Sequence, residues 1–185
     1  KQELEENRKQ LATINDMLQT VINTIPVRIF WKDTASVYLG CNELFAKDAG
    51  KQNPGEVIGK DDLALGWHNG AASYVRDDRT VMTSGVAKIN YEEQQTAPNG
   101  RRRWLRTTKV PLCDHRGQVV GVLGTYEDIS REKQTADALR ESEQRYRNLF
   151  QNSYATMLII DPENGMIVDV NAAACKYYGY ELPQL

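Results

Sequence analysis

With 185 residues, 41% of them hydrophobic and 26% charged, the chain has the length of one ordinary domain with attachments and the composition of a globular protein rather than a disordered one. Its formal net charge of −2 provides no overall positive field toward nucleic acid, and no apolar run approaches the roughly 20 residues that cross a bilayer. We therefore expect a soluble segment that contacts neither nucleic acid nor a membrane.

The first 25 residues have the pattern of a coiled-coil helix. Apolar side chains recur at steps of three and four, with Asn7 in one of these positions: Leu4, Leu11, Ile14, Leu18, Val21 and Ile25. Pro26 ends the helix, because proline lacks an amide donor and disfavours helical geometry in the residue before it. The stripe predicts a parallel homodimer formed through Leu11, Ile14, Leu18 and Val21.

A hairpin and a short helix are predicted next. Residues 27–31 and 37–41 are rich in β-branched and aromatic side chains, and residues 32–36 supply a polar turn between these two strands. Asn42 is placed to cap a short helix over residues 43–48, because its side-chain oxygen can accept from a backbone amide of the first turn.

A second helix is predicted over residues 71–84, and Gly85 ends it. The side chains that share its apolar face are Ala72, Val75, Arg79 and Met82.

The chain then changes to strand periodicity. Residues 88–96, 102–112 and 118–128 are predicted strands, separated by turns at 98–100 and 114–117, which makes an antiparallel meander. Arg101, Arg102 and Arg103 alternate between the two faces of a strand, so they do not form one basic patch, and we expect them at an exposed hairpin end.

A helix follows the meander, and after it the pattern of the first module begins again. Ser130 is a predicted cap for the helix that ends near Phe150. Residues 156–160 and 166–170 are predicted strands followed by Asn171, so residues 167–171 correspond to residues 38–42. Two related modules are therefore joined by one helix.

The order of these elements resembles the PAS family. The stretches that carry the resemblance are Asn99-Gly100-Arg101-Arg102-Arg103-Trp104 and Gly121 through Asp128-Ile129-Ser130, where Asp-Ile-Ser is similar to the Asp-Ile-Thr ending of the family's PAC-type meander. Residues 143–150 resemble the helix that leads into a further PAS domain, and the second copy stops at Leu185 before its meander.

The resemblance implies an α+β fold: a PAS-like antiparallel five-stranded sheet with short helices on one face, flanked by coiled-coil-prone helices. The expected organisation is an N-terminal coiled-coil-type helix (1–25), a PAS domain (26–130), a linker signalling helix (131–150) and the start of an incomplete second PAS domain (151–185).

The resemblance also implies a function: a sensory module of a multidomain signalling protein of the histidine kinase or diguanylate cyclase type, with an output domain in the same polypeptide. Asp128, Ile129 and Ser130 would relay a conformational change into the helix that follows. The segment carries no P-loop, nucleophile elbow or phosphoacceptor motif, so we do not expect it to be an enzyme.

Aromatic residues suggest a ligand cavity between the helices and the sheet. The candidates for its lining are Phe30, Phe45, Tyr74, Trp104 and Tyr126, and the candidates for orienting a ligand are Asn42, Arg79 and Arg106. The alternative is that the aromatic rings only fill the core and the polar residues serve as a helix cap and surface ion pairs. In that case the module is a ligand-free dimerisation and spacer unit.

No cofactor or metal is required by the sequence. His68 lies near the position of the iron ligand in haem-binding relatives, but a loop histidine is the favoured interpretation. The reactive-cysteine motif of flavin photoreceptors does not occur between Cys41 and Cys113. A haem- or flavin-binding redox sensor is therefore the least favoured alternative.

Cysteine usage indicates a reducing compartment. Cys41, Cys113 and Cys175 are far apart, odd in number and form no C-x-x-C motif, so they make no disulfide framework. We expect a cytoplasmic location within a parent protein that could itself be membrane-anchored.

Overall fold

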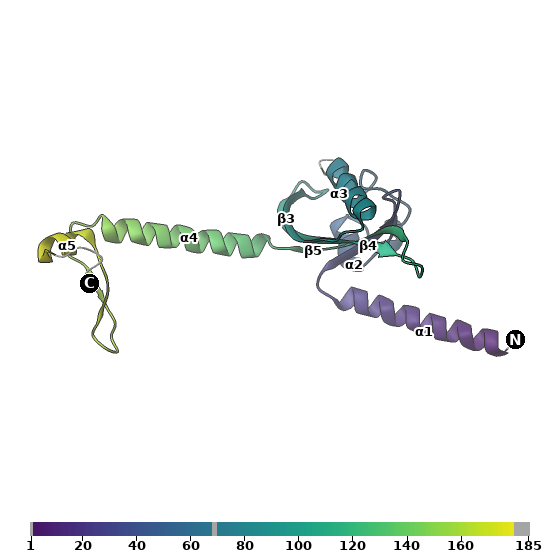
Figure 1. The fold of residues 1–185 in the computed structure, drawn as a ribbon, viewed down its shortest axis with the longest axis horizontal. Helices are drawn as coiled ribbons and strands as arrows, with labels where there is room; N and C mark the ends of the chain where they lie inside the picture. The colour runs from purple at the N-terminus through teal and green to yellow at the C-terminus, as the bar shows by residue number, and fades with distance from the viewer. Residues whose placement is uncertain (1, 68–69, 180–185) are drawn as a thin grey trace. The chain divides into compact units, whose positions relative to one another are not determined.

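The computed structural model describes residues 2–67 and 70–179 (Figure 1). Its contacts divide the chain into two compact units, Lys1–Ser130 and Arg131–Leu185. Among the helices within the described ranges, none is long and apolar enough to span a bilayer.

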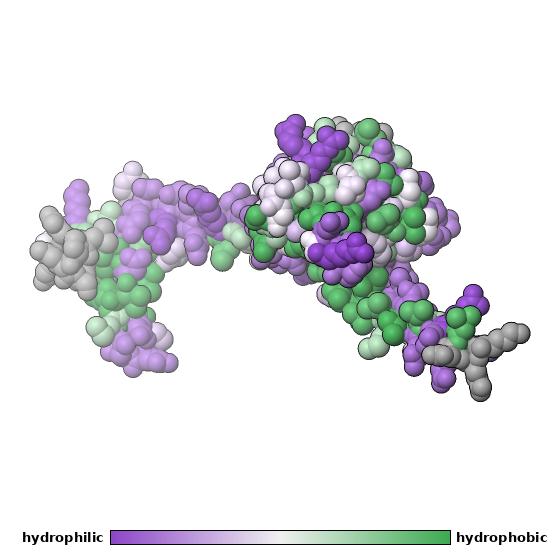
Figure 2. All heavy atoms as spheres, turned by 45° about the vertical axis from the view of Figure 1, so that its right-hand side comes forward, coloured by the Kyte–Doolittle hydropathy of each residue, from purple (hydrophilic) through white to green (hydrophobic). Residues whose placement is uncertain are grey.

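The first helix, α1 (Gln2–Thr24), keeps its apolar stripe on the surface. Leu11, Ile14 and Leu18 are all exposed, and Figure 2 shows hydrophobic side chains along this helix. Its last turn is bound to the sheet-forming part of the first unit, because Asn42 Nδ2 donates to the carbonyl of Ile22 at 3.0 Å.

The first unit is built on a five-stranded antiparallel sheet, as predicted. Its strands are β1 (Arg28–Asp33), β2 (Tyr38–Cys41), β3 (Lys88–Thr96), β4 (Arg102–Cys113) and β5 (Val119–Asp128). Their order in the sheet is β2-β1-β5-β4-β3, so the predicted meander β3-β4-β5 is joined to the first hairpin through β5 and β1. The α+β fold class is therefore confirmed.

β1 is longer than the predicted strand, and its extra residues matter for the site. Lys32 and Asp33 were expected in a polar turn, but they pair with Val122 and Gly121 of β5. The charged side chains of Lys32 and Asp33 resemble those of a surface turn in the sequence. In the fold, the ammonium group of Lys32 has buried carboxylates as partners.

The turn between β1 and β2 contains a strained serine. Ser36 has a φ of 63°, its side chain is buried, and its hydroxyl oxygen has no hydrogen-bond partner within the described residues. Asp33 Oδ1 organises the turn by accepting from the amides of Ala35 and Val37, both at 2.9 Å.

Replacement of Ser36 by glycine is expected to stabilise the first unit by about 0.5–1 kcal/mol, because glycine adopts a left-handed φ without strain and removes a buried unpaired hydroxyl. The free energy of unfolding from urea titration measures the gain. Ser36→Ala separates the two causes, since it removes the hydroxyl but keeps the Cβ. A Ser36→Gly protein that is less stable than the wild type would contradict this explanation.

Short helices cover one face of the sheet. They are α2 (Glu43–Asp48), the 3-10 helix η1 (Pro54–Glu56) and α3 (Ala71–Ser84). The cap predicted at Asn42 is confirmed, because its Oδ1 accepts from the amide of Phe45 at 3.0 Å. The predicted end of α3 is also confirmed, since Gly85 terminates it with a left-handed φ of 68°.

α3 buries a different face from the predicted one. Ala71, Asp78 and Val81 are its buried residues, whereas Arg79 is exposed and Val75 is only half-buried. The prediction followed the apolar residues of the helix. In the fold, the carboxylate of Asp78 points inward and binds two lysines of the sheet, Lys32 and Lys109.

The second unit repeats the start of the first. It contains α4 (Ser130–Gln151) from Arg131 onward, β6 (Leu158–Ile160), β7 (Ile167–Val170) and α5 (Ala172–Tyr178). The strands β6 and β7 pair antiparallel. Asn171 Oδ1 accepts from the amides of Met157 and Ala174, as Asn42 Oδ1 accepts from those of Ile29 and Phe45. The repeat seen in the sequence is therefore a repeat of hydrogen bonding.

Candidate ligand cavity

Aromatic side chains from four elements form the core of the first unit. The ring of Phe30 of β1 contacts those of Phe45 of α2 and Tyr38 of β2, with centroids 5.1 and 5.7 Å away, and Phe45 contacts Tyr126 of β5 at 6.1 Å. Gly124, which pairs with Phe30, makes room for the phenylalanine ring, since a Cβ there would lie 2.1 Å from Phe30 Cζ.

A small cavity of about 30 Å³ lies beside these rings. It is lined by aromatic, charged and polar side chains: Phe30, Lys32, Tyr38, Phe45, Asp62, Trp67, Tyr74, Glu93, Gln95, Leu105, Thr107, Lys109 and Tyr126. A buried water needs roughly 10–15 Å³ of such space, so the cavity has room for about two water molecules.

Three buried charged side chains line this cavity, Lys32, Asp62 and Lys109, and a fourth, Asp78, binds both lysines. Lys32 Nζ donates to Asp62 at 2.7 Å and to Asp78 at 2.8 Å, and Lys109 Nζ donates to the other oxygen of Asp78 at 2.5 Å. Each of the four side chains is at most 3% exposed. We call Lys32, Asp62, Asp78 and Lys109 the charged tetrad.

The tetrad has no net charge, and a phenol hydroxyl binds one of its carboxylates. Its two ammonium groups match its two carboxylates, which is the condition under which buried ions are tolerated. Tyr38 donates its hydroxyl to Asp62 at 2.7 Å. Burial, together with the negative charge of Asp62, raises the pKa of Tyr38 well above its ordinary value, so this hydroxyl remains a donor.

Polar groups from β3 and β4 complete the wall. Thr107 donates to Glu93 Oε1 at 2.7 Å, and Lys109 Nζ also donates to the carbonyl of Tyr74 at 3.2 Å. Burial raises the pKa of Tyr74, although its hydrogen bond with Gln95 opposes the rise. The cavity therefore presents an ammonium group, a half-buried carboxylate, an amide and phenols among aromatic faces.

A second polar cluster centres on Asp48, the last residue of α2. Its Oδ2 accepts from Arg28 Nε at 2.9 Å, from Arg103 Nη1 at 2.8 Å and from the hydroxyl of Tyr126 at 3.1 Å. Arg103 also donates to Gln95 Oε1 at 3.0 and 2.7 Å. The expectation that Arg103 lies at an exposed hairpin end is wrong, because its position in β4 faces the interior.

The end of β5 is tied to β4 where α4 begins. The amide of Trp104 donates to Ser130 Oγ, and the amide of Ile129 donates to the carbonyl of Trp104, both at 2.9 Å. The amide of Ser130 donates to Asp128 Oδ1 at 3.0 Å. The first amide of α4 is therefore bound by Asp128, and the hydroxyl oxygen of Ser130, the predicted cap, accepts from β4 instead.

Asp128 is held in its ionised form. Burial alone would raise its pKa, but the hydrogen bonds from the hydroxyl and amide of Ser130 and the positive charges of Arg103 and Arg28 outweigh burial, so the pKa lies below its ordinary value. A depressed pKa in the fold means that ionised Asp128 stabilises the protein above its unfolded pKa of about 3.9, and that this contribution is lost as the pH falls through the folded value.

Asp128→Ala is expected to cost about 1 kcal/mol at pH 7, the usual effect of losing a helix cap. The difference from the wild type should stay constant down to about pH 5 and shrink below about pH 4, as Asp128 protonates. Urea titrations across this range measure it. Asp128→Asn is the control, because it keeps an acceptor but loses the charge. A difference between Asp128→Ala and wild type that grows in acid would contradict a depressed pKa for Asp128.

The structure brings some of the predicted site residues together and separates others. Phe30, Phe45, Tyr74 and Tyr126 line the cavity. Asn42 is fully buried, but it binds backbone groups of Val27, Ile29 and Phe45.

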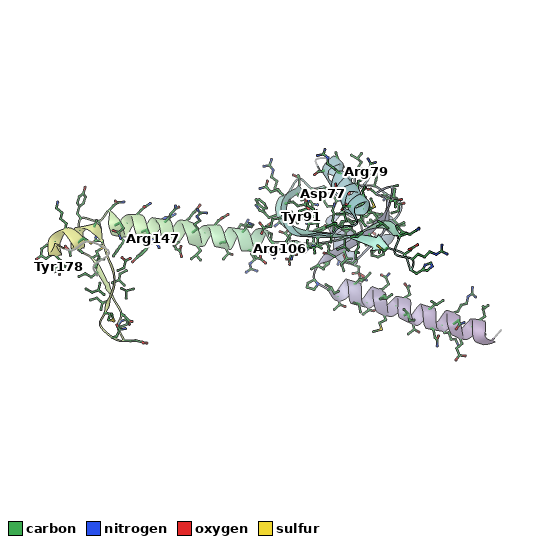
Figure 3. The ribbon with its side chains drawn as sticks, viewed as in Figure 1. Asp77, Arg79, Tyr91, Arg106, Arg147 and Tyr178 are labelled. Carbon is green, nitrogen blue, oxygen red and sulfur yellow. The ribbon has the colours of Figure 1, made fainter. Side chains whose placement is uncertain are left out.

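Three predicted site residues lie elsewhere. Trp104 and Arg106 alternate with the inward residues of β4, so they lie on the other face of the sheet, where Arg106 pairs with Glu127 at 2.7 Å. Arg79 is exposed on α3, and Figure 3 shows Arg79 and Arg106 on opposite sides of the sheet. His68 lies outside the described residues.

The residues that sequence reasoning missed are the charged ones: Lys32, Asp48, Asp62, Asp78, Arg103 and Lys109. A signal for the lysines was present. Lys32 stands two residues after Phe30, and Lys109 stands four after Leu105, so each shares the inward face of its strand with an apolar neighbour. A charged residue in phase with a core stripe indicates a buried polar site.

Comparison with known proteins identifies the family. A model of the PAS fold matches residues 22–134, and a PAS domain model matches residues 144–185. The aerobic respiration control sensor protein ArcB of Escherichia coli K12 is 27% identical over 128 residues, which are 69% of this chain and 16% of ArcB. The methanogenesis regulatory histidine kinase FilI of Methanothrix harundinacea is 26% identical over 171 residues, 90% of this chain and 18% of FilI.

Solved structures share the fold at lower identity. A Vibrio cholerae VqmA dimer has a TM-score of 0.57 at 22% identity, covering 61% of this chain and 50% of that one. The PAS domain of Bordetella pertussis BvgS has a TM-score of 0.55 at 20% identity, covering 72% and 98%. VqmA bound to DPO has a TM-score of 0.56 at 21% identity, covering 89% and 72%.

The expected set of partners needs correction. The exclusion of nucleic acid is wrong, because VqmA is a DNA-binding receptor with this fold. The charge of a PAS module says nothing about a domain to which it is joined, so it cannot exclude such a partner. The parallel homodimer and the output domain in the same polypeptide gain no support from these comparisons.

The fold, the order of strands and the relatives agree on one class of module. ArcB is a sensor protein and FilI is a regulatory histidine kinase, and the first part of this chain matches the PAS fold rather than a catalytic domain. The segment is accordingly a sensory module and is not itself catalytic. The chain belongs to the PAS family, with one PAS domain followed by a second, shorter PAS-like segment.

Proposed function

We propose that the first unit senses a small polar molecule in the cavity beside the charged tetrad, and that it passes a conformational change through Asp128, Ile129 and Ser130 into α4. The observation that carries this proposal is the combination of paired buried charges and aromatic faces around one cavity.

The cost of burying charge supports a binding role. Apolar side chains of similar volume often stabilise a core as well as a buried ion pair does, or better. Because the tetrad side chains are at most 3% exposed, their desolvation costs more free energy than burial of apolar side chains of the same volume. The tetrad supplies oriented donors and acceptors that an apolar core would lack, and these are what a polar ligand requires.

The wall favours a compact molecule that has both an acceptor and a donor. Lys109 provides an ammonium group and Glu93 a carboxylate, and the rings of Phe45, Trp67 and Tyr126 provide flat apolar contacts. A structure of VqmA bound to DPO supports the idea that this fold takes up a small molecule. Because the present cavity is small, binding would select a more open arrangement of the same wall.

The signalling context is part of the same proposal. The chain spans less than a fifth of ArcB and of FilI, so their activities are not its own. FilI is a histidine kinase, and this relationship favours a histidine-kinase type of signalling protein over a diguanylate cyclase.

A ligand-free spacer is the second candidate. The observation that favours it is the cavity volume of about 30 Å³, which suits water better than a metabolite.

Native mass spectrometry distinguishes the two functions. The purified chain is incubated with the protein-free, low-mass fraction of a bacterial cell extract, in parallel with Leu105→Phe, which places a larger side chain into the cavity. A sensor gives an added small mass on the wild type that is missing from Leu105→Phe. A wild type that stays bare, or the same added mass on both proteins, would contradict ligand binding in this cavity.

A cytoplasmic setting also belongs to the proposal. Cys41, Cys113 and Cys175 are all free, and Cys113 is exposed. A free surface thiol is compatible with a reducing compartment. Labelling of Cys113 in intact cells by a membrane-permeant maleimide, but not by an impermeant one, supports this location, and labelling by both would contradict it.

A further inference from the structure

One wall of the cavity is hydrogen-bonded to a group outside it. The ring of Tyr126 lines the cavity, and its hydroxyl donates to Asp48 Oδ2 at 3.1 Å. Burial, followed by the charge of Asp48, raises the pKa of Tyr126 well above its ordinary value. The phenol is therefore a permanent donor, and a shift of its ring must change its bond to Asp48.

The oxygen of Asp48 that accepts from Tyr126 also accepts from two guanidinium groups. Arg28 and Arg103 approach Oδ2 at 2.9 and 2.8 Å, and the Arg103 side chain is 7% exposed. Hydrogen bonds to charged groups are the stronger ones, and a carboxylate oxygen has few acceptor directions. A stronger or weaker bond from Tyr126 therefore changes how Asp48 holds Arg103.

Arg103 leads directly to the start of α4. The next residue in β4, Trp104, accepts from the amide of Ile129 and donates to Ser130 Oγ, both at 2.9 Å. β4 is thus connected to the cavity wall through the Arg103 side chain and Asp48, and to the first residue of the helix through the backbone of Trp104.

We propose that Asp48 is a positioning residue that couples the cavity to α4, through the path Tyr126, Asp48, Arg103 and the backbone of Trp104. The inference rests on the proposed sensory function and names its internal route. Asp48 touches no ligand in this scheme. It transmits the position of the Tyr126 ring to the hydrogen bonds that hold Ile129 and Ser130.

Hydrogen exchange followed by mass spectrometry tests the route without a ligand. Tyr126→Phe removes only the hydroxyl that reaches Asp48. It is expected to speed amide exchange in a peptide covering residues 128–135 by about tenfold or more, the effect of losing one hydrogen bond to a charged acceptor. A peptide covering β5 residues 119–124 should keep its exchange rate, which excludes global unfolding.

The chain offers a matched control. Tyr91 of β3 donates its hydroxyl to Asp77 of α3 at 3.4 Å, and Figure 3 shows the two residues between these elements. Tyr91→Phe therefore makes the same chemical change away from the route, and it should leave residues 128–135 unchanged. Equal exchange there in Tyr126→Phe and Tyr91→Phe, or a uniform rise over all peptides, would overturn the proposal. Because no ligand is used, a bare protein in the mass spectrometry experiment does not alter this result.

Discussion

Asp78→Asn is expected to lower the free energy of unfolding by roughly 3–5 kcal/mol, the largest of the expected effects. Asp78 is fully buried and binds both lysines of the charged tetrad, one with each oxygen. The asparagine keeps the shape but removes the charge, which takes from Lys109 the carboxylate that balances it. Urea titration followed by circular dichroism measures the loss.

The neighbouring residue supplies the control. Asp77 pairs with Lys88 at 2.9 Å, but the lysine side chain is 43% exposed. Exposed pairs contribute about 0–1 kcal/mol, so Asp77→Asn should change stability little. The loss in Asp78→Asn should persist at high salt, since a buried pair is poorly screened. Similar small losses in both variants would show that the tetrad is hydrated and would remove the main support for a desolvated binding site.

Asn42→Ala is expected to cost roughly 2–4 kcal/mol, the second largest effect, because one fully buried side chain serves several backbone groups. Its oxygen accepts from the amides of Ile29 and Phe45, and its nitrogen donates to the carbonyls of Val27 and Ile22. Alanine leaves these buried groups unpaired. Thermal and urea unfolding of the purified variant measure the loss.

Asn42→Asp separates the bonds of the oxygen from those of the nitrogen. An ionised aspartate keeps the oxygen that accepts from the two amides and loses the nitrogen that donates to the two carbonyls. Its second oxygen faces the carbonyls of Val27 and Ile22 in a buried site, so this variant should be no more stable than Asn42→Ala. A stability of Asn42→Ala within about 0.5 kcal/mol of the wild type, the range of ordinary surface substitutions, would contradict the structural role of this residue.

The elements that could be predicted are those whose signals are local. Asn42, Gly85 and the meander turns act within a few residues of their own position, and each is found as predicted. Aromatic cavity residues such as Phe30 and Phe45 were also identified, because large rings are placed in the interior by their area alone. Caps, turns and large aromatic residues can therefore be identified without knowing which residues they contact in the fold.

The charged tetrad could not be predicted, because its pairs depend on register between distant segments. Lys32 and Asp78 are 46 positions apart, so neither predicts the other. The phase of β4 was misjudged for a related reason. Trp104 is larger than Arg103, but the sheet turns Arg103 inward, where Asp48 and Gln95 bind it. A shift of one residue moves every side chain to the other face.

The most direct test of sensing is amide exchange at residues 128–135, measured with and without the low-mass extract fraction on the wild type and on Leu105→Phe. If the cavity controls the start of α4, the fraction changes exchange at these residues in the wild type and leaves Leu105→Phe unaltered. A molecule that binds in the cavity while exchange at residues 128–135 stays the same would contradict that control.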